Sequence, residues 1–220
     1  KRNGDAYRRI RNTTRFLLSN LGDFNPDKDS IDHPDMLLLD QWIMKRLSVI
    51  DQSIQTDYEE YSFHRIIQTL HNFCVNDMGG FYLDIIKDRL YTMPKNSKGR
   101  RSAQTVLLHI AESLVRWIAP VLSFTAEEIW QLLPRRHVPS VFLSEWHDIV
   151  RVGNNNDWEM ILDLNEVAAK ALEIARDKKI IGSPLDADLT LYANKELTEF
   201  LEPLTDELRF LFITSSATIK

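Results

Sequence analysis

Apolar residues recur at steps of three and four along most of the first 135 positions, which is the period of an α-helix. In the first such stretch they are Tyr7, Ile10, Thr14, Leu17 and Leu21. Further ladders, separated by Pro, Gly and polar residues, predict helices over about residues 5–20, 36–54, 63–91, 103–118 and 125–133. Helices that each bury one face predict an antiparallel helical bundle.

Local signals place the helix ends. Asp35 is a candidate N-cap for the second helix, after a polar loop over residues 26–34. Thr125 with Glu128 three residues later is a capping-box pattern, which predicts that the fifth helix opens there. The Gly79–Gly80 pair predicts an interruption or kink in the third helix.

The pattern changes after Pro139. Residues 141–146 look extended, and residues 153–156 look like a linker. Beyond the linker, the periodicity predicts in turn a helix, a strand, a second helix and a second strand, over residues 157–179, 187–192, 194–205 and 208–214. The sequence therefore predicts a mainly α fold, with a helical bundle over residues 1–150 and a small α/β appendage over residues 151–220.

The polar face of the first helix carries Arg8, Arg11, Asn12 and Arg15, with Phe16 beside them. Guanidinium forks bind phosphates, and an amide and an aromatic ring can contact single-stranded bases. This stripe is therefore a candidate nucleic-acid surface. The alternative is a solvated face that forms salt bridges with acidic residues of the same chain.

The charge distribution is uneven. The 220 residues carry a formal charge of −5, but residues 1–20 and 87–101 each hold six basic residues and one acidic residue. Two basic windows on an acidic body suggest a localised anionic partner. In the second window Lys95, Arg100 and Arg101 are candidate nucleic-acid contacts, and a solvated loop is the alternative.

No catalytic or nucleotide-binding motif is visible in the sequence, which has neither GxGxxG nor a Walker loop. His64, His71 and Cys74 share a helical face, and with Asp77 they could be combined into a metal site. The ligand set is incomplete, so a helix–helix interface is the favoured interpretation. Nothing nearby activates Cys74 as a nucleophile.

One aromatic and one acidic feature have structural interpretations as well. Trp117, Phe124 and Trp130 are expected in the core rather than in base stacking. Glu127–Glu128 are expected to stabilise a helix start rather than to act as a general acid/base pair.

Composition limits the class and location of the protein. The hydrophobic content of 44% and charged content of 27% are ordinary for a globular protein. No run of 18 apolar residues and no secretory leader is present, so neither a membrane span nor secretion is expected. The single cysteine fits a reducing cytoplasm. Because the chain opens without Met, we expect a fragment of a longer polypeptide.

Three segments resemble one family in the expected order and spacing: AYRRIRNTTRFLL (6–18), FYLDIIKDRLYT (81–92) and SFTAEEIW (123–130). They resemble the anticodon-binding domain of bacterial isoleucyl-tRNA synthetases, and the similarity extends over essentially the whole chain. The first and third segments also occur in valyl, leucyl and methionyl enzymes, whereas the second favours the isoleucyl enzymes.

The resemblance implies that tRNA(Ile) is the partner, bound through its anticodon stem-loop. Asn12 and Arg15 resemble the base-reading pair of methionyl enzymes, with Arg8 and Arg11 as backbone contacts and Phe16 as a stacking face. The family's two catalytic signature motifs and its zinc-binding cysteine cluster are absent from this sequence. The resemblance therefore implies that ATP, Mg and Zn are used outside this chain, and that the chain partners the catalytic domain of its own polypeptide.

The residues leave other functions open. The chain could be the corresponding domain of a valyl, leucyl or methionyl enzyme, a helical protein-interaction module, or an intact enzyme with an unrecognised site. Neither DNA nor a membrane is an expected partner.

Overall fold

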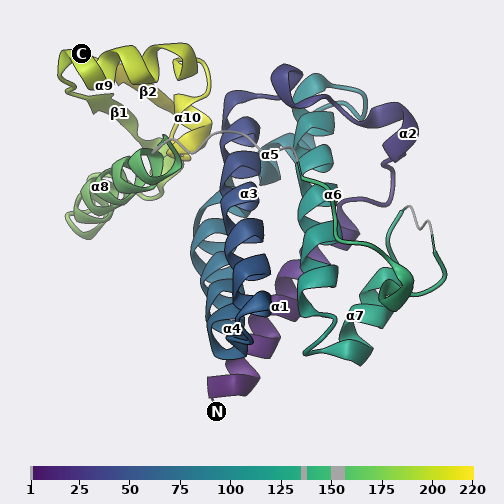
Figure 1. The fold of residues 1–220 in the computed structure, drawn as a ribbon. Coiled ribbons are helices and arrows are strands. Elements are labelled where there is room, and N and C mark those ends of the chain that lie inside the picture. The colour runs from purple at the N-terminus through teal and green to yellow at the C-terminus, as the bar shows by residue number, and fades with distance from the viewer. Residues whose placement is uncertain (1, 135–137, 150–156) are drawn as a thin grey trace. The chain divides into compact units, whose positions relative to one another are not determined.

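The computed structural model describes residues 2–134, 138–149 and 157–220. The chain divides into two compact units, Lys1–Asn154 and Asn155–Lys220 (Figure 1). As predicted, the fold is mainly α-helical, and within the described part of the chain the strands lie in the second unit only.

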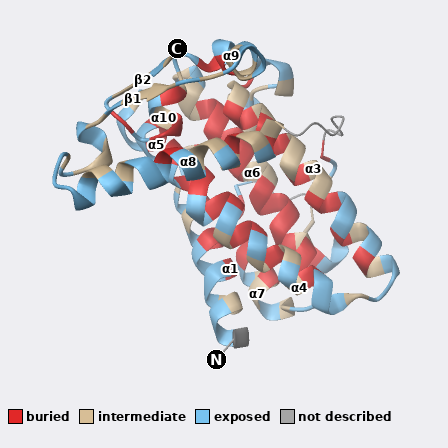
Figure 2. Cartoon of the chain, turned by 90° about the vertical axis from the view of Figure 1, so that its left-hand side faces the viewer, coloured by how far each residue is buried: buried red, intermediate tan, exposed pale blue. Residues whose placement is uncertain are grey.

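The first unit is a bundle built around one long helix. Its helices are α1 (Arg2–Ser19), α2 (Pro26–Asp29), α3 (Leu38–Glu59), α4 (Phe63–Asn72), α5 (Leu83–Thr92), α6 (Lys98–Ile118) and α7 (Ser123–Trp130). α6 packs against α1, α3, α5 and α7 and is buried over most of its length, as the red segments in Figure 2 show. The predicted helical bundle is therefore confirmed, with α6 as its centre.

The amphipathic character of α1 is also confirmed. Ile10, Thr14 and Leu17 are buried against the bundle, and the Thr14 hydroxyl donates to the Ile10 carbonyl at 2.9 Å. The arginines at positions 11 and 15 are exposed on the other side of the helix. Burial of the apolar face thus fixes which side chains α1 presents to solvent.

The third predicted helix is interrupted around Gly79–Gly80, as predicted, although the interruption is itself helical. Phe73–Tyr82 forms a π-helix that joins α4 to α5. A Cβ at Gly79 would lie 3.1 Å from the Cys74 carbonyl oxygen, and one at Gly80 would lie 3.2 Å from that of Val75. The two glycines therefore relieve crowding inside this wider helical turn.

Two predicted helix starts are wrong. Asp35 lies in a 3₁₀ turn (His33–Asp35), and α3 begins later, at Leu38. Its N-cap residue Leu37 has no capping side chain, and the Leu37 N–H donates instead to the Ser102 hydroxyl on α6 at 3.1 Å. A tertiary hydrogen bond replaces the local cap. The predicted loop before it contains α2, which Asn25 caps.

The capping box of the fifth helix is the second wrong start. α7 begins at Ser123, so Thr125 and Glu128 both lie inside the helix. Their side chains contact Tyr7 and Arg11 of α1 rather than the helix end.

The segment after α7 differs from the extended segment predicted there. Val141–Leu143 forms a 3₁₀ turn. Ser140 caps its start, and the Ser140 hydroxyl accepts from the Phe142 N–H. The predicted linker over residues 153–156 lies outside the described residues.

A buried polar cluster joins four elements of the bundle. Asp40 of α3 has no exposed surface and accepts hydrogen bonds from both terminal nitrogens of Arg89 on α5, at 2.9 and 3.2 Å. The Tyr82 hydroxyl of the π-helix and the Ser102 hydroxyl of α6 donate to the same carboxylate. The cluster fixes the relative positions of these elements because each donor reaches the same buried acceptor.

The second unit is a small α/β arrangement. Its elements are α8 (Asp157–Asp177), β1 (Asp188–Leu191), α9 (Lys195–Leu201), α10 (Leu208–Leu211) and β2 (Ser216–Ile219), with 3₁₀ turns at Pro184–Asp186 and Glu202–Leu204. β1 and β2 are parallel, with Leu189 opposite Ala217. A parallel pair needs a crossover connection, which the helical residues between the strands supply.

The second strand was predicted in the wrong place. Residues 208–214 include α10, where Leu208, Leu211 and Phe212 are buried at helical spacing. The strand follows at Ser216–Ile219.

Candidate nucleic-acid interface

Of the four polar side chains in the solvent-facing stripe of α1, two are paired and two have no partner among the described residues. Asn12 and Arg15 are exposed, and neither has a hydrogen-bond or ion-pair partner among the described residues. Arg8 is exposed and pairs loosely with Asp5 at 3.5 Å, one turn earlier. Arg9, outside the predicted stripe, is also exposed without a described partner.

Arg11 is tied to α7. Its two terminal nitrogens donate to the Glu128 carboxylate at 3.3 and 3.5 Å, and one of them also donates to the Tyr7 hydroxyl at 3.0 Å. The Tyr7 hydroxyl lies 3.3 Å from the Thr125 hydroxyl. These contacts fasten the first turns of α1 to α7.

The same contacts shift two pKa values. The hydrogen bond from Arg11 to Tyr7 and the charge of Glu128 raise the pKa of Arg11. The hydrogen bonds of Tyr7 with Thr125 and with Arg11 lower the pKa of Tyr7. Arg11 is therefore charged under all ordinary conditions. The predicted alternative, salt bridges to acidic residues of the same chain, holds for Arg11 and, over a longer distance, for Arg8.

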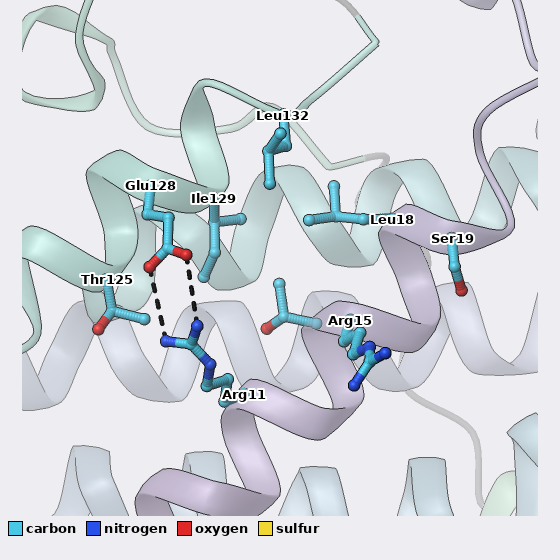
Figure 3. A pocket seen from close by; sticks show the side chains of 9 residues that line it. Arg11, Arg15, Leu18, Ser19, Thr125, Glu128, Ile129 and Leu132 are labelled. Atoms are coloured by element: carbon cyan, nitrogen blue, oxygen red, sulfur yellow. Dashed lines mark hydrogen bonds and ion pairs between the residues drawn. The ribbon is translucent and has the colours of Figure 1, made fainter.

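A pocket of about 380 Å³ lies between α1 and α7 (Figure 3). Its lining is Arg11, Thr14, Arg15, Leu18, Ser19, Thr125, Glu128, Ile129 and Leu132. Leu18, Ile129 and Leu132 supply an apolar wall, while the Arg11–Glu128 pair stands at one side and Arg15 at the other (Figure 3). An apolar cavity with a few converging polar groups is typical of a site for one small group.

The aromatic residues fall into two classes. Trp117 and Trp130 are buried, as predicted, and their indole N–H groups donate to Asp51 at 2.8 Å and to the Val138 carbonyl at 3.1 Å. Phe124, predicted beside them in the core, is 95% exposed. α7 buries Ala126, Ile129 and Trp130, which leaves position 124 on the opposite side of the helix.

Phe16 of the predicted stripe is half-buried beside it. Its ring is therefore less available for stacking than that of Phe124, on the helix that lines the pocket. The sequence reasoning missed Phe124, Thr125 and Glu128 as interface candidates, because their pattern was interpreted as core packing and helix capping.

The second basic window is only partly available to a partner. Lys95 is exposed and has no described partner. Arg100 donates to both oxygens of Asp23, at 3.0 and 3.1 Å, and to the Leu90 carbonyl at 2.7 Å. Arg101 is buried; it donates to Gln104 and pairs with Asp29 at 3.4 Å.

These contacts place Arg100 and Arg101 at the start of α6 rather than in the expected solvated loop. Burial raises the pKa of Asp23, but hydrogen bonds from Gln104 and Arg100 outweigh burial and hold that pKa below its usual value. Both arginines therefore fasten the segment after α1 to α6, and this structural role accounts for their conformation.

The described residues do not form the reactive cysteine or the metal site that were considered from the sequence. Cys74 is buried, and burial raises the pKa of its thiol to about 12. His64 is exposed rather than at the predicted interface, and Asp77 pairs with Arg46 at 3.3 Å. Within the described residues, no group of three or more His, Cys, Asp or Glu side chains could hold a metal ion. No helix formed by these residues is long and apolar enough to cross a membrane.

Comparison with known families identifies the bundle. Residues 40–191 match the family model described as the anticodon-binding domain of tRNA ligase. The chain belongs to this anticodon-binding domain family. The match begins at Asp40, so α1 precedes it, but the relatives described next extend over α1 as well.

The anticodon-binding domain is similar over its whole length to bacterial proteins named isoleucine–tRNA ligase. It is 51% identical over 220 residues to that of Legionella pneumophila (strain Paris), with 99% of this chain and 24% of the relative covered. It is 48% identical over 224 residues to that of Halorhodospira halophila and 49% identical over 225 residues to that of Pseudomonas aeruginosa. Both of these alignments cover 100% of this chain and 24% of the relative.

The chain thus spans about a quarter of the length of these relatives. The family predicted from the three sequence segments is confirmed.

Proposed function

We propose that this domain binds the anticodon stem-loop of tRNA(Ile) on behalf of an isoleucine–tRNA ligase of which it is one segment. The identity of 48–51% to isoleucine–tRNA ligases along the whole chain supports the choice of isoleucine over valine, leucine or methionine. The observation that carries the proposal is the pair Asn12 and Arg15, which are exposed and have no hydrogen-bond or ion-pair partner within the described part of the chain, with Arg15 lining the pocket.

Each exposed polar group of α1 has a role that suits its chemistry. Asn12 offers an amide that can pair with a base edge, and Arg15 offers a guanidinium fork for a base or a phosphate. Arg8 contacts the phosphate backbone of the RNA. Its ion pair with Asp5 is exposed and weak, so a phosphate can replace Asp5 as its partner. Lys95 can add a phosphate contact at a second point of the surface.

The chemistry of aminoacylation belongs to the rest of the polypeptide in this proposal. The catalytic domain, which partners this chain, uses ATP and Mg, and Zn is bound by other segments. A single, buried cysteine fits a cytoplasmic setting. Recognition of the anticodon by the bundle then serves to raise affinity and to orient the tRNA for a distant active site.

A gel-shift titration over a range of salt concentrations tests the binding role. The chain should prefer tRNA(Ile) to the same tRNA with a swapped anticodon, and affinity should fall steeply with salt, because phosphate contacts release counterions. Asn12→Ala and Arg15→Ala should each cost ~1–3 kcal/mol of binding free energy. Arg176→Ala, an exposed arginine on α8, is the matched control.

Two outcomes contradict the proposal. If both α1 variants bind every tRNA like the parent, the stripe is not the reader. If tRNA affinity is weak and independent of salt, the bundle is a protein-interaction module instead. An ATP–pyrophosphate exchange assay of the chain alone addresses the remaining alternative, because measurable exchange would show an enzyme active site within it.

A further inference from the structure

The pocket between α1 and α7 has a cation on one side and a carboxylate on the other. Arg15 has no partner among the residues that the structure describes, so its guanidinium can donate to a ligand. Glu128 accepts from both terminal nitrogens of Arg11, but its side chain remains 58% exposed. A carboxylate has about four acceptor sites, and a bidentate arginine occupies only two of them. Glu128 therefore keeps acceptor capacity for a second donor.

We propose that this pocket receives one unstacked base of the bound RNA, and that Glu128 selects a base with an exocyclic amino group and rejects uracil. The inference rests on the proposed function, since it assumes that the RNA loop lies on α1. It assigns specificity to a residue of α7, outside the stripe that the sequence indicated.

The apolar wall suits the flat face of a base. Leu18 comes from α1, while Ile129 and Leu132 come from α7 and the turn that follows it. A volume of about 380 Å³ is near the lower end of the range for small-molecule sites, which fits a single nucleotide unit better than two. Bases in single-stranded loops are accessible for this kind of insertion.

The polar groups then discriminate between bases. A carboxylate only accepts hydrogen bonds, so it favours the amino groups of adenine, cytosine and guanine. Uracil instead presents one N–H between two carbonyl oxygens, and one of those oxygens would face Glu128. Arg15 supplies the donor for a carbonyl or ring nitrogen on the other side of the base, or for its phosphate.

Arg11 is a positioning residue in this scheme. It donates to the Tyr7 hydroxyl and to the Glu128 carboxylate, and these contacts fix the orientation of the carboxylate at the pocket. This explains why Arg11 lies at the pocket while its guanidinium is already engaged.

The test uses RNA hairpins with the anticodon loop of tRNA(Ile), in which each loop base other than uracil is replaced by uracil one position at a time. Dissociation constants are measured by fluorescence anisotropy for the parent chain, Glu128→Gln and Glu59→Gln. Glu59 is exposed on α3 and does not line the pocket, so this control removes the same charge elsewhere.

At one loop position, uracil should weaken binding by the parent and by Glu59→Gln by ~10-fold or more. Glu128→Gln should reduce this ratio to near one, because a carboxamide can donate to a uracil carbonyl. If the parent binds the hairpins but Glu128→Gln keeps the parent's ratio at every position, the inference is overturned and the proposed function stands. If the parent binds no hairpin, the proposed function fails, and the inference with it.

Discussion

Arg11 of α1 and Glu128 of α7, 117 positions apart in the sequence, lie 3.3 Å apart at the mouth of the pocket. Both side chains are more than half exposed, at 52% and 58%. An exposed pair of this kind contributes little to folding, because water and salt screen it. Its consequence is geometric, since it fixes the carboxylate at the edge of the pocket.

Arg11→Ala should therefore leave the urea midpoint of unfolding close to that of the parent, while it loosens the choice between bases in the pocket. The stability is measured by urea denaturation monitored by circular dichroism. The base preference is measured as the ratio of the affinities for the uracil-substituted and the unsubstituted loop hairpins. A large drop in stability with an unchanged ratio would show that the pair serves the fold instead.

Substitution of Arg15 should affect RNA binding, whereas substitution of Arg100 should affect the stability of the fold. Arg15→Ala should reduce the slope of log affinity against log salt by roughly 0.7, the value for one phosphate contact on a single strand, if Arg15 contacts a phosphate. Arg100→Ala should lower the free energy of unfolding by roughly 1.5–3 kcal/mol, because it leaves the Asp23 carboxylate and the Leu90 carbonyl without this donor. Tight binding with an unchanged slope in Arg15→Ala would contradict the first half of this prediction.

The positions of these two arginines show what the sequence can and cannot predict. The helical period of α1 fixed the exposure of Arg15, because a residue opposite Ile10 and Leu17 must face solvent. Arg100 follows Pro94 and Gly99 in a segment with the composition of a loop, and its contacts with the Leu90 carbonyl and the distant Asp23 carboxylate hold it against the bundle. Local pattern predicts which face is buried, but not which charges meet across the fold.

The predictions of helix ends and of the second strand were wrong for a related reason. The α3 start depends on Ser102, 65 residues away, so no local cap could reveal it. Thr125 and Glu128 have the sequence pattern of a capping box, but their side chains contact Tyr7 and Arg11 of α1 instead. The segment at 208–214 shows alternation and helical spacing at once, and burial of Leu208 and Leu211 decided for the helix.

The buried pair Asp40–Arg89 should dominate the mutational sensitivity of the bundle. Asp40→Ala leaves the charged, buried Arg89 without the carboxylate that accepts from both of its terminal nitrogens, and breaking a buried ion pair in this way costs ~3–5 kcal/mol in comparable cases. Tyr82→Phe removes only one of the hydrogen bonds to the same carboxylate and should cost ~0.5–1.5 kcal/mol. Urea unfolding measures both, with the exposed Asp84→Ala as the control. Equal midpoints for Asp40→Ala and the control would contradict this role.

The thiol of Cys74 should be inert in the folded protein. Burial in the π-helix raises its pKa to about 12, and the thiolate is the form that reacts. A disulfide reagent at pH 8 should therefore modify less than stoichiometric thiol in the native chain and one thiol per chain in urea. Fast modification without denaturant would show that the π-helix opens readily.

His109 and His147 should make the stability of the first unit depend on pH. The His109 Nδ1 and His147 Nε2 atoms lie 3.0 Å apart, so one ring donates and the other accepts while both are neutral. Burial lowers the pKa of both rings; for His147 the charges of His109 and Arg116 add to burial and bring the pKa to about 3. An unfolded histidine titrates near 6.5.

Below about pH 6.5 the unfolded chain therefore binds more protons at these two sites than the folded chain does. Stability is fully present above that pH and falls as the pH drops towards the folded pKa, by up to ~1.4 kcal/mol per pH unit for each histidine. Thermal melts of the parent and of His147→Gln between pH 7.5 and 5 measure this, and the variant should show the shallower dependence. The exposed His64→Gln is the control and should keep the parent's slope. Equal slopes for all three proteins would mean that the His109–His147 contact opens before the rings are protonated.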